Sequence, residues 1–291
     1  MADIVTGGLY PYIGITDDYM FTTVLCQHPE ICLTLLRYML PDITISHVAY
    51  KPFDDNAVPS AQPNVQQTFS SAVDAHGVRL DVYYDDGKSM FDVEMHNGKD
   101  PNLPKRARYT RSSIDATALK RGEKYHQLRP CYVIYICTFD PYDKGLYLYT
   151  AESRIVEDLS VRHEDEAYTL YFNVKGTKGK VPEPMKEILR YIRDPQSYPV
   201  EKTNVDVIKQ IDEAVKFNQQ SAEWRREYSM LQLHMQDAEL RGERKGRKLV
   251  ARTMFEKNMP EKEIAALTKL TPEELLSIKE ELDVRKEPEG G

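Results

Sequence analysis

The sequence predicts an α/β fold in which a mixed central sheet is flanked by helices and followed by a helical C-terminal region. Three observations lead to this fold class. Two alternating runs, 78–84 and 89–97, flank a tight Asp-Gly turn and are typical of a hairpin. The apolar run "CYVIYICTF" (131–139) is typical of a central strand that is covered on both faces. Near residue 200 proline becomes scarce and strand-type patterning ends.

Composition limits the class of protein. The chain has 291 residues, of which 41% are hydrophobic and 29% charged, which is enough for a sizeable core and an added helical region. The net charge of -7 gives no overall sign of a nucleic-acid binder. The four cysteines form no Cys-x-x-Cys pair, and we interpret them as buried reduced thiols. Without a signal-peptide pattern or an apolar stretch that could span a bilayer, we expect a cytoplasmic protein.

Two helices are expected at the start of the chain. Thr16 can cap the first, "TDDYMFTTVLCQ", and Asp17 and Asp18 suit the positive end of its dipole. The second has Pro29 near its first position and stops before Pro41. A short strand is then expected at 43–50 and a loop at 51–64, and both precede the hairpin.

Helices and strands alternate after the hairpin. A helix is expected over 103–122, because Pro104 comes early in it and Gly122 falls just past its end. The apolar run follows, then further strands at 145–151 and 167–174, and a short helix closes this part at 183–194. Residues 1–200 are therefore expected to form the first domain.

The C-terminal region is predicted to be helical throughout. One long helix is expected over 201–257, with an apolar stripe in steps of three and four that is typical of a coiled-coil seam. The stripe comprises Val207, Ile211, Ala214, Phe217, Ser221, Trp224, Tyr228, Leu231, Met235 and Ala238. Its partner is either the same helix of a second chain or the body of its own chain. We favour a homodimer through the 207–238 helix.

The end of the chain, 258–284, is predicted to form a small helical hairpin in which Thr271 and Glu274 fit a capping box. An alternative is a DNA-reading helix-turn-helix, but this stretch is acid-rich, unlike a helix that enters the major groove. We therefore expect a packing or dimerisation role, followed by a disordered tail at 285–291.

Candidate functional residues gather on the hairpin. In "FDVEMHN" (91–97), strand alternation puts Asp92, Glu94 and His96 on one face. Pairing can bring Asp81, on the first strand, to the same end as Glu94. Paired carboxylates suit a hard divalent cation, which can activate water and neutralise charge on a phosphodiester. His96 can orient or deprotonate that water, and Asp92 can add a ligand or tune the site. The alternative is a solvated acidic face.

A basic segment follows the acidic hairpin. Residues 99–129 contain nine Lys or Arg and three acids, a local balance of +6. Arg108 and Arg111 are three apart and share a helix face, and Lys105 and Arg106 belong to the same helix. These cations can bind the phosphates of a polyanion, while a metal on the hairpin promotes cleavage of the phosphodiester bond between them. Alternatively, they neutralise the nearby acids or solvate the helix.

Asp81, the short turn and Glu94-x-His96 before a basic helix resemble the PD-(D/E)XK nuclease superfamily. More specifically, the chain resembles the recombination-promoting nuclease and transposase family of bacteria. The matching stretches cover most of the chain in order: "TDDYMF", "RLDVYYDDGKSMFDVEMHN", "RARYTRSSIDATALKRGEKYHQLRPCYVIYICTFD" and "KGRKLVARTMFEKNMPEKEIAALTKLTPEEL".

The resemblance implies a restriction-endonuclease-like sheet and a Mg²⁺-dependent DNA endonuclease, which hydrolyses phosphodiester bonds with Mg²⁺ or another divalent cation. It also implies roles in recombination or in defence against foreign DNA. Asp81 and Glu94 match the metal-binding acids, and Asp18 matches the acid of the "Asp-x-x-Phe" opening. Arg108 and Arg111 match the family's basic helix, for which the resemblance implies either contact with the DNA backbone or core packing.

Other positions match less closely. Tyr109 and Tyr125 match family aromatics, for which we favour core packing. His96 stands where the superfamily has Lys and this family usually has Gln, and Thr22 stands where Lys commonly follows the Phe. Gln orients water, Lys donates charge, and neutral His accepts a proton. The substitution at His96 leaves an alternative open, a catalytically degenerate DNA-binding or assembly protein on the same fold.

Overall fold

A computed structural model describes residues 12–46, 49–50, 67–69, 78–80, 82–119 and 121–284. They fall into two compact units, the first ending at Ser221 and the second beginning at Ala222. Three expectations lie outside the described residues, namely the loop at 51–64, the strand position of Asp81, and the tail at 285–291.

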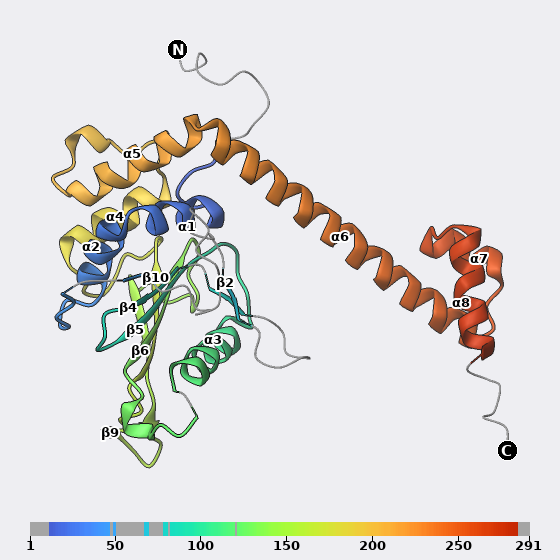
Figure 1. The fold of residues 1–291 in the computed structure, drawn as a ribbon, viewed down its shortest axis with the longest axis horizontal. Coiled ribbons are helices and arrows are strands. Elements are labelled where there is room, and N and C mark those ends of the chain that lie inside the picture. Colours follow the sequence, from blue (N-terminus) through green and yellow to red (C-terminus); the bar gives the residue numbers. More distant parts are fainter. Residues whose placement is uncertain are drawn as a thin grey trace. The chain divides into compact units, whose positions relative to one another are not determined.

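The first unit is built on one six-stranded sheet with the order β1-β4-β5-β6-β10-β7 (Figure 1). β6 pairs in parallel with both β5 and β10, whereas the pairs β1–β4, β4–β5 and β10–β7 are antiparallel. The sheet is therefore mixed, as predicted. Its strands are β1 (Ala49–Tyr50), β4 (Val82–Asp85), β5 (Met90–His96), β6 (Cys131–Cys137), β7 (Leu148–Ala151) and β10 (Ala167–Asn173).

The apolar run singled out in the sequence is β6, and it lies in the middle of this sheet. Each of its seven residues is buried. Two parallel neighbours satisfy its backbone hydrogen bonds, and helices cover both faces. This confirms the prediction of a central strand with two buried faces. All four cysteines are buried and none forms a disulfide, which also agrees with the prediction.

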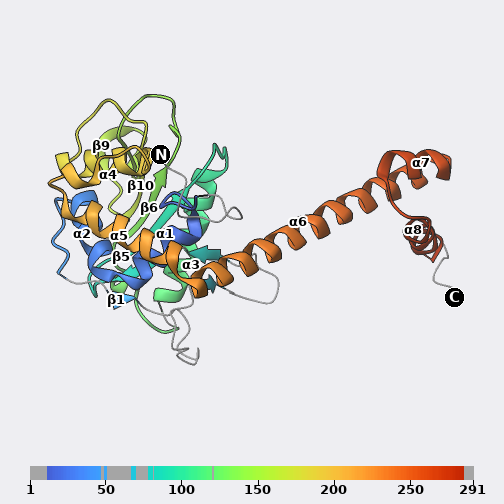
Figure 2. The ribbon, with the colours of Figure 1, turned by 90° about the horizontal axis from the view of Figure 1, so that it is seen from above.

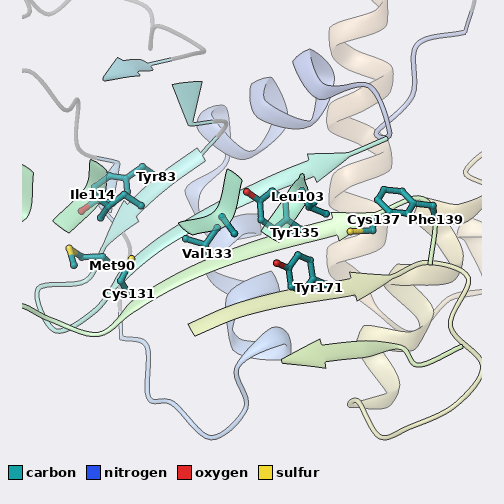
Figure 3. Close-up of a cluster of buried hydrophobic side chains, with 11 residues drawn as sticks. Tyr83, Met90, Leu103, Ile114, Cys131, Val133, Tyr135, Cys137, Phe139 and Tyr171 are labelled. Carbon is teal, nitrogen blue, oxygen red and sulfur yellow. The ribbon is translucent and has the colours of Figure 1, made fainter. Parts of the chain in front are cut away.

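Helices lie on both sides of the sheet (Figures 1 and 2). On one face, α3 (Leu103–Ala118) buries Leu103, Ala107 and Ile114 in a cluster with Val133 and Tyr135 of β6 (Figure 3). The other face carries a layer in which α2 contacts α1, α4 and α5. The helices of this layer are α1 (Asp18–Gln27), α2 (Pro29–Met39), α4 (Glu183–Arg193) and α5 (Asp206–Gln220).

The first helix is capped by Asp17 and not by Thr16, which corrects the prediction. Because the helix begins at Asp18, the capping position is the residue directly before it. The Asp17 carboxylate accepts hydrogen bonds from the backbone N–H groups of Tyr19 and Met20, at 3.0 and 3.1 Å. The second helix begins at Pro29, as predicted.

The hairpin turn between β4 and β5 forms where the Asp-Gly pair predicted it. Asp86 Oδ1 accepts from the N–H groups of Lys88 and Ser89, and Gly87 has a positive φ of 82°, which suits glycine. The first strand is shorter than expected, because residues 78–80 pair elsewhere. They form β3 (Val78–Leu80), which joins β2 (Gln67–Phe69) in a separate two-stranded sheet.

A second small sheet was not predicted. It consists of β8 (Arg154–Ile155) and β9 (Asp158–Arg162), and every residue of β9 is exposed. No buried face imposes alternation on such strands, so hydrophobic periodicity does not reveal them. Two short 3-10 turns complete the first unit, at Tyr125–Gln127 and Val200–Lys202.

The single helix predicted over 201–257 is two helices, which corrects the prediction. α5 ends at Gln220, Ser221 is extended, and α6 (Ala222–Glu256) belongs to the second unit. The buried side of α5 includes Val207, Ile208, Ile211, Ala214 and Val215, a broad stripe typical of a helix on a globular core.

The first half of the homodimer seam predicted over 207–238 is therefore buried within its own chain. α5 packs against α1 and α2 of its own chain, which was the alternative partner considered from the sequence. Phe217, expected in the seam, is 71% exposed. Val207, Ile211 and Ala214, which the seam would need at the partner chain, are instead buried within their own chain.

The second unit consists of α6, α7 (Glu261–Thr268) and α8 (Pro272–Val284). Its core is formed by Ala251, Ile264, Leu270, Leu275, Ile278 and Leu282. The capping box is confirmed, since Glu274 accepts from Thr271 N at 3.0 Å and Glu274 N donates to Thr271 Oγ1 at 3.3 Å. Within the described part of the chain, no helix combines the length and apolarity needed to cross a membrane.

Candidate functional site

The polar face of β5 lies beneath α3. Register sets Asp92 opposite Val133 and Glu94 opposite Tyr135, and both of these β6 residues belong to the cluster that α3 covers. Asp92 is 0% exposed and Glu94 is 1% exposed. Two carboxyl groups are thus buried on one strand face, and the alternative of a solvated acidic face is wrong for them.

Glu94 has few partners for a buried carboxylate. Arg106 Nη2 lies 3.1 Å from Glu94 Oε2. Apart from that ion pair and a contact with the Asp92 carboxyl, neither oxygen of Glu94 accepts a well-directed hydrogen bond within the described residues. Buried carboxylates ordinarily have more partners than this, because an ion without them is costly to bury.

The electrostatic surroundings of Glu94 reflect this burial. Burial raises the pKa of the Glu94 carboxyl, while Arg106 and a hydrogen bond with Asp92 act in the opposite direction. Asp18 adds to the rise. Burial also raises the pKa of the Tyr135 hydroxyl, and the negative charges of Glu94 and Asp92 contribute. The site therefore has an excess of buried acid, which a cation can neutralise.

His96, two residues beyond Glu94, is half-buried. Its ring lies edge-on to Tyr135 and Phe139, with centroids 5.9 and 5.8 Å away. Burial lowers the pKa of His96, and Arg106 lowers it further while Asp100 opposes the change. The imidazole is therefore neutral near pH 7, and its Nε2 accepts or donates no hydrogen bond within the part of the chain that is described.

Asp18 is exposed at the start of α1, close enough to Glu94 to influence its pKa. Asn97, which directly follows β5, connects Asp18 to the end of that strand. Asn97 Nδ2 donates to Asp18 Oδ1 at 3.2 Å and to the backbone oxygen of Thr16 at 2.6 Å. The structure thus brings Asp18 together with the end of β5, from about 80 residues away in the sequence.

Asp81 lies outside the described residues, so the predicted pairing of Asp81 with Glu94 is not observed. The next residue, Val82, pairs with Val93, which is the residue directly before Glu94. No group of three or more His, Cys, Asp or Glu side chains suited to a metal is found among residues that the structure describes. The described part of the site supplies oxygen donors, the ligand type that Mg²⁺ prefers, from Glu94 and Asp92.

The four basic residues predicted to contact DNA have different surroundings. Lys105 and Arg108 are exposed on α3. Arg106 is paired with Glu94 and 46% exposed. Arg111 is half-buried, and its Nη2 donates to Thr169 Oγ1 of β10 in a short hydrogen bond. Arg111 therefore holds α3 to the sheet.

The two aromatic residues expected to pack in the core do not. Tyr109 is 43% exposed on α3, and Tyr125 is 87% exposed in the turn that follows. The preference for packing is therefore wrong, most clearly for Tyr125.

Sequence reasoning missed three parts of the site. It listed Arg106 among the DNA contacts and, as an alternative, let the basic residues neutralise nearby acids, but it did not identify its pair with Glu94. It did not single out Asn97 or Tyr135. Asn97 directly follows the acidic strand, which was a usable signal, but nothing in a long apolar run marks Tyr135 as a neighbour of two acids.

Comparison with known proteins identifies a family for most of this region. A family model described as PD-(D/E)XK nuclease family transposase matches residues 64–239, which is more than half of the chain. The match includes the β4–β5 hairpin and α3. Neither the curated proteins nor the solved structures contain a match to the chain.

Proposed function

The chain belongs to the PD-(D/E)XK nuclease family transposases, and from this membership we propose that it is a Mg²⁺-dependent DNA endonuclease. Its reaction is the hydrolysis of a phosphodiester bond, with DNA as the substrate. Glu94 carries the proposal, because its carboxylate is buried, has few hydrogen-bond partners and lies on the strand that the family pattern assigns to the metal.

The residues present fit a divalent metal. Glu94 would be one ligand, and Asp81 would be the second, from a position directly before Val82 in β4. Asp92 would support them from the same strand face. When bound, a divalent metal would activate water and neutralise charge that builds on the phosphate. Asp18, through Asn97, would fix the end of β5 beside the site.

His96 is proposed to hold the attacking water. Burial lowers its pKa, so the imidazole is neutral near pH 7, and a neutral imidazole has a lone pair that can accept a proton. The family residue expected here, Gln, can orient water but cannot take its proton. Two roles therefore remain for His96, and a variant separates them: His96→Gln retains activity if the residue orients water, and loses activity near neutral pH if the imidazole is the base.

The exposed cations of α3 are proposed to hold the DNA backbone. Lys105 and Arg108 lie on the helix that covers the acidic strand, so phosphates bound to them would lie beside the site. Tyr109, exposed on the same helix, offers a ring that can stack on a base or sugar. Arg111 is not included, because its guanidinium contacts Thr169.

A plasmid-cleavage time course tests the proposal. Glu94→Gln and Asp81→Asn should each remove Mg²⁺-dependent cleavage, and the double variant should be little worse, because ligands of one metal act as a unit. EDTA should stop the wild-type reaction, and circular dichroism should show every variant folded. Full activity in folded Glu94→Gln would exclude this site.

The alternative function is a DNA-binding or assembly protein in which the nuclease site no longer works. One observation favours it, namely that His96 replaces the usual Gln or Lys. In that case the wild-type protein binds DNA, with the salt dependence of phosphate contacts, but leaves plasmid intact at every Mg²⁺ concentration.

We also propose that the chain forms a homodimer, now through α6 alone. Trp224 stacks on Tyr228 at its start, with centroids 5.1 Å apart, and further along the helix Met230, Leu233 and Met235 are each more than half exposed. Exposed apolar side chains on a long helix favour a second helix as partner. Leu231→Asp with Met235→Asp should give monomers in light scattering, and a monomeric wild-type chain would exclude the dimer.

A further inference from the structure

Arg106 of α3 forms an ion pair with Glu94, the residue proposed above as a metal ligand. Its guanidinium lies 3.1 Å from Glu94 Oε2, at the end of a side chain that is 46% exposed. Glu94 itself is 1% exposed. The arginine thus reaches from the surface of α3 to a buried carboxylate, while much of its length stays in contact with solvent.

A divalent metal on Glu94 would compete with this contact. Mg²⁺ binds oxygen at about 2.0–2.1 Å and keeps its own shell of water, so little room remains for a guanidinium on the same oxygen. The two cations would also repel each other at such a separation. A metal that binds Glu94 should therefore displace Arg106.

The displaced guanidinium can bind a phosphate of the DNA. Lys105 and Arg108, its neighbours on α3, are exposed on the helix that covers the site. A guanidinium presents parallel N–H groups that match the oxygens of a phosphate, and arginine is well suited to this contact. In a complex with DNA, Arg106 would lie beside the phosphate on which the metal acts.

We propose that Arg106 is a positioning residue that occupies Glu94 in the metal-free protein, gives way to the divalent metal, and then binds a phosphate of the DNA. The inference rests on the proposed function, since it takes Glu94 as a metal ligand. Arg106 would thus couple metal binding to DNA binding. Arg108, two residues further along the same helix, makes no ion pair within the described residues and has no such role.

Calorimetric titration of the full chain with Mn²⁺ tests the first step. Arg106→Gln should bind Mn²⁺ more tightly than wild type, by up to about fivefold, because removal of a half-exposed ion pair frees the ligand. Arg106→Lys keeps the charge and should stay close to wild type. Arg108→Gln is the matched control, since it also removes one exposed charge from α3, and its Mn²⁺ affinity should not change.

DNA binding tests the second step, with Ca²⁺ used to bind the site without cleavage. Arg106→Gln should lower the salt-dependence slope by about 0.9 when Ca²⁺ is present, and should leave it unchanged in EDTA, where Arg106 stays on Glu94. Arg108→Gln should lower the slope under both conditions.

The outcomes separate the two proposals. A wild-type protein that does not bind Mn²⁺ would overturn the metal site and this inference with it. If wild type binds Mn²⁺ and Arg106→Gln binds it no more tightly, the metal site stands and the exchange at Glu94 is excluded. Equal slopes for Arg106→Gln and wild type in Ca²⁺ would exclude the phosphate contact.

Discussion

Two of the buried acids in the hairpin of β4 and β5, Asp85 and Glu94, have opposite surroundings. At the turn, Asp85 is 3% exposed, and both of its oxygens bind the Arg129 guanidinium, one of them at 2.8 Å. It also accepts from Gly87 N at 2.7 Å. Glu94, on the other strand, is buried as deeply but has one ion pair and its contact with Asp92.

Under the proposed function, the difference separates an acid that stabilises the fold from an acid that binds the metal. Asp85 contributes to the fold because both of its buried oxygens accept hydrogen bonds. Within the described residues Glu94 has only its ion pair with Arg106 and its contact with Asp92, so its ionised form lowers the stability of the fold. We propose that Glu94 serves the reaction instead, with a divalent cation as its partner.

The largest expected difference between the two acids is in activity. Glu94→Gln should lower Mg²⁺-dependent cleavage by at least about a hundredfold, because the metal supplies several kcal/mol of transition-state stabilisation. Asp85→Asn makes the same chemical change on the same hairpin and should retain the activity of its folded fraction. Initial rates on supercoiled plasmid, normalised to folded protein, measure both. Equal losses would remove the distinction.

In stability, Asp85→Asn should lose more than Glu94→Gln, the opposite of their order in activity. Asp85→Asn should lower the free energy of unfolding by roughly 1–3 kcal/mol, because Arg129 loses a charged, bidentate partner. Glu94→Gln should raise the stability of the metal-free protein by about 1 kcal/mol, since a buried charge is removed. Urea unfolding in EDTA measures both values. A large loss in Glu94→Gln would mean that its pair with Arg106 is structural.

The pH dependence of stability sharpens the comparison. Because the pKa of Glu94 is raised in the folded protein, its contribution is fully present below the unfolded pKa and is lost as pH rises through the folded pKa. The advantage of Glu94→Gln over wild type should therefore grow between acidic and neutral pH. Urea midpoints across this range, in EDTA, give the difference. A constant difference would show that Glu94 titrates normally.

The smallest expected effects concern two arginines of α3. Arg111→Gln should lower stability by about 1 kcal/mol through loss of its hydrogen bond to Thr169, without a change in the salt slope of DNA binding. Arg108→Gln should keep its stability and lower that slope by about 0.9. Thermal unfolding and salt titrations separate them. The reverse pattern would show that Arg108 stabilises the fold and that Arg111 contacts DNA.

The fold was largely predictable because its elements carry local signals. The run that forms β6 is continuous and apolar, the turn has its Asp-Gly pair, and Thr271 and Glu274 fit a capping box at the start of α8. The break at Ser221 was not predictable from periodicity, because one polar residue does not interrupt an apolar stripe that continues on both sides of it. The break separates α5, which packs on α1 and α2, from α6, which belongs to the second unit.

The candidate site was predictable in part. The alternation in "FDVEMHN" places Asp92, Glu94 and His96 on one face in the sequence as in the structure. The sequence does not show that α3 buries this face, and so it does not pair Arg106 with Glu94. The orientation of a helix over a sheet is a tertiary property. For the same reason the different surroundings of Arg108 and Arg111 were not foreseen.

The central claim is that Glu94 is a ligand of a divalent metal, and thermal unfolding with and without Mg²⁺ tests it most directly. At about 100 times its dissociation constant, Mg²⁺ should stabilise wild type by about 2.7 kcal/mol and raise its Tm. Asp85→Asn should show the same rise from a lower starting Tm. Glu94→Gln should start higher and show no rise. A rise in Glu94→Gln equal to that of wild type would contradict the claim.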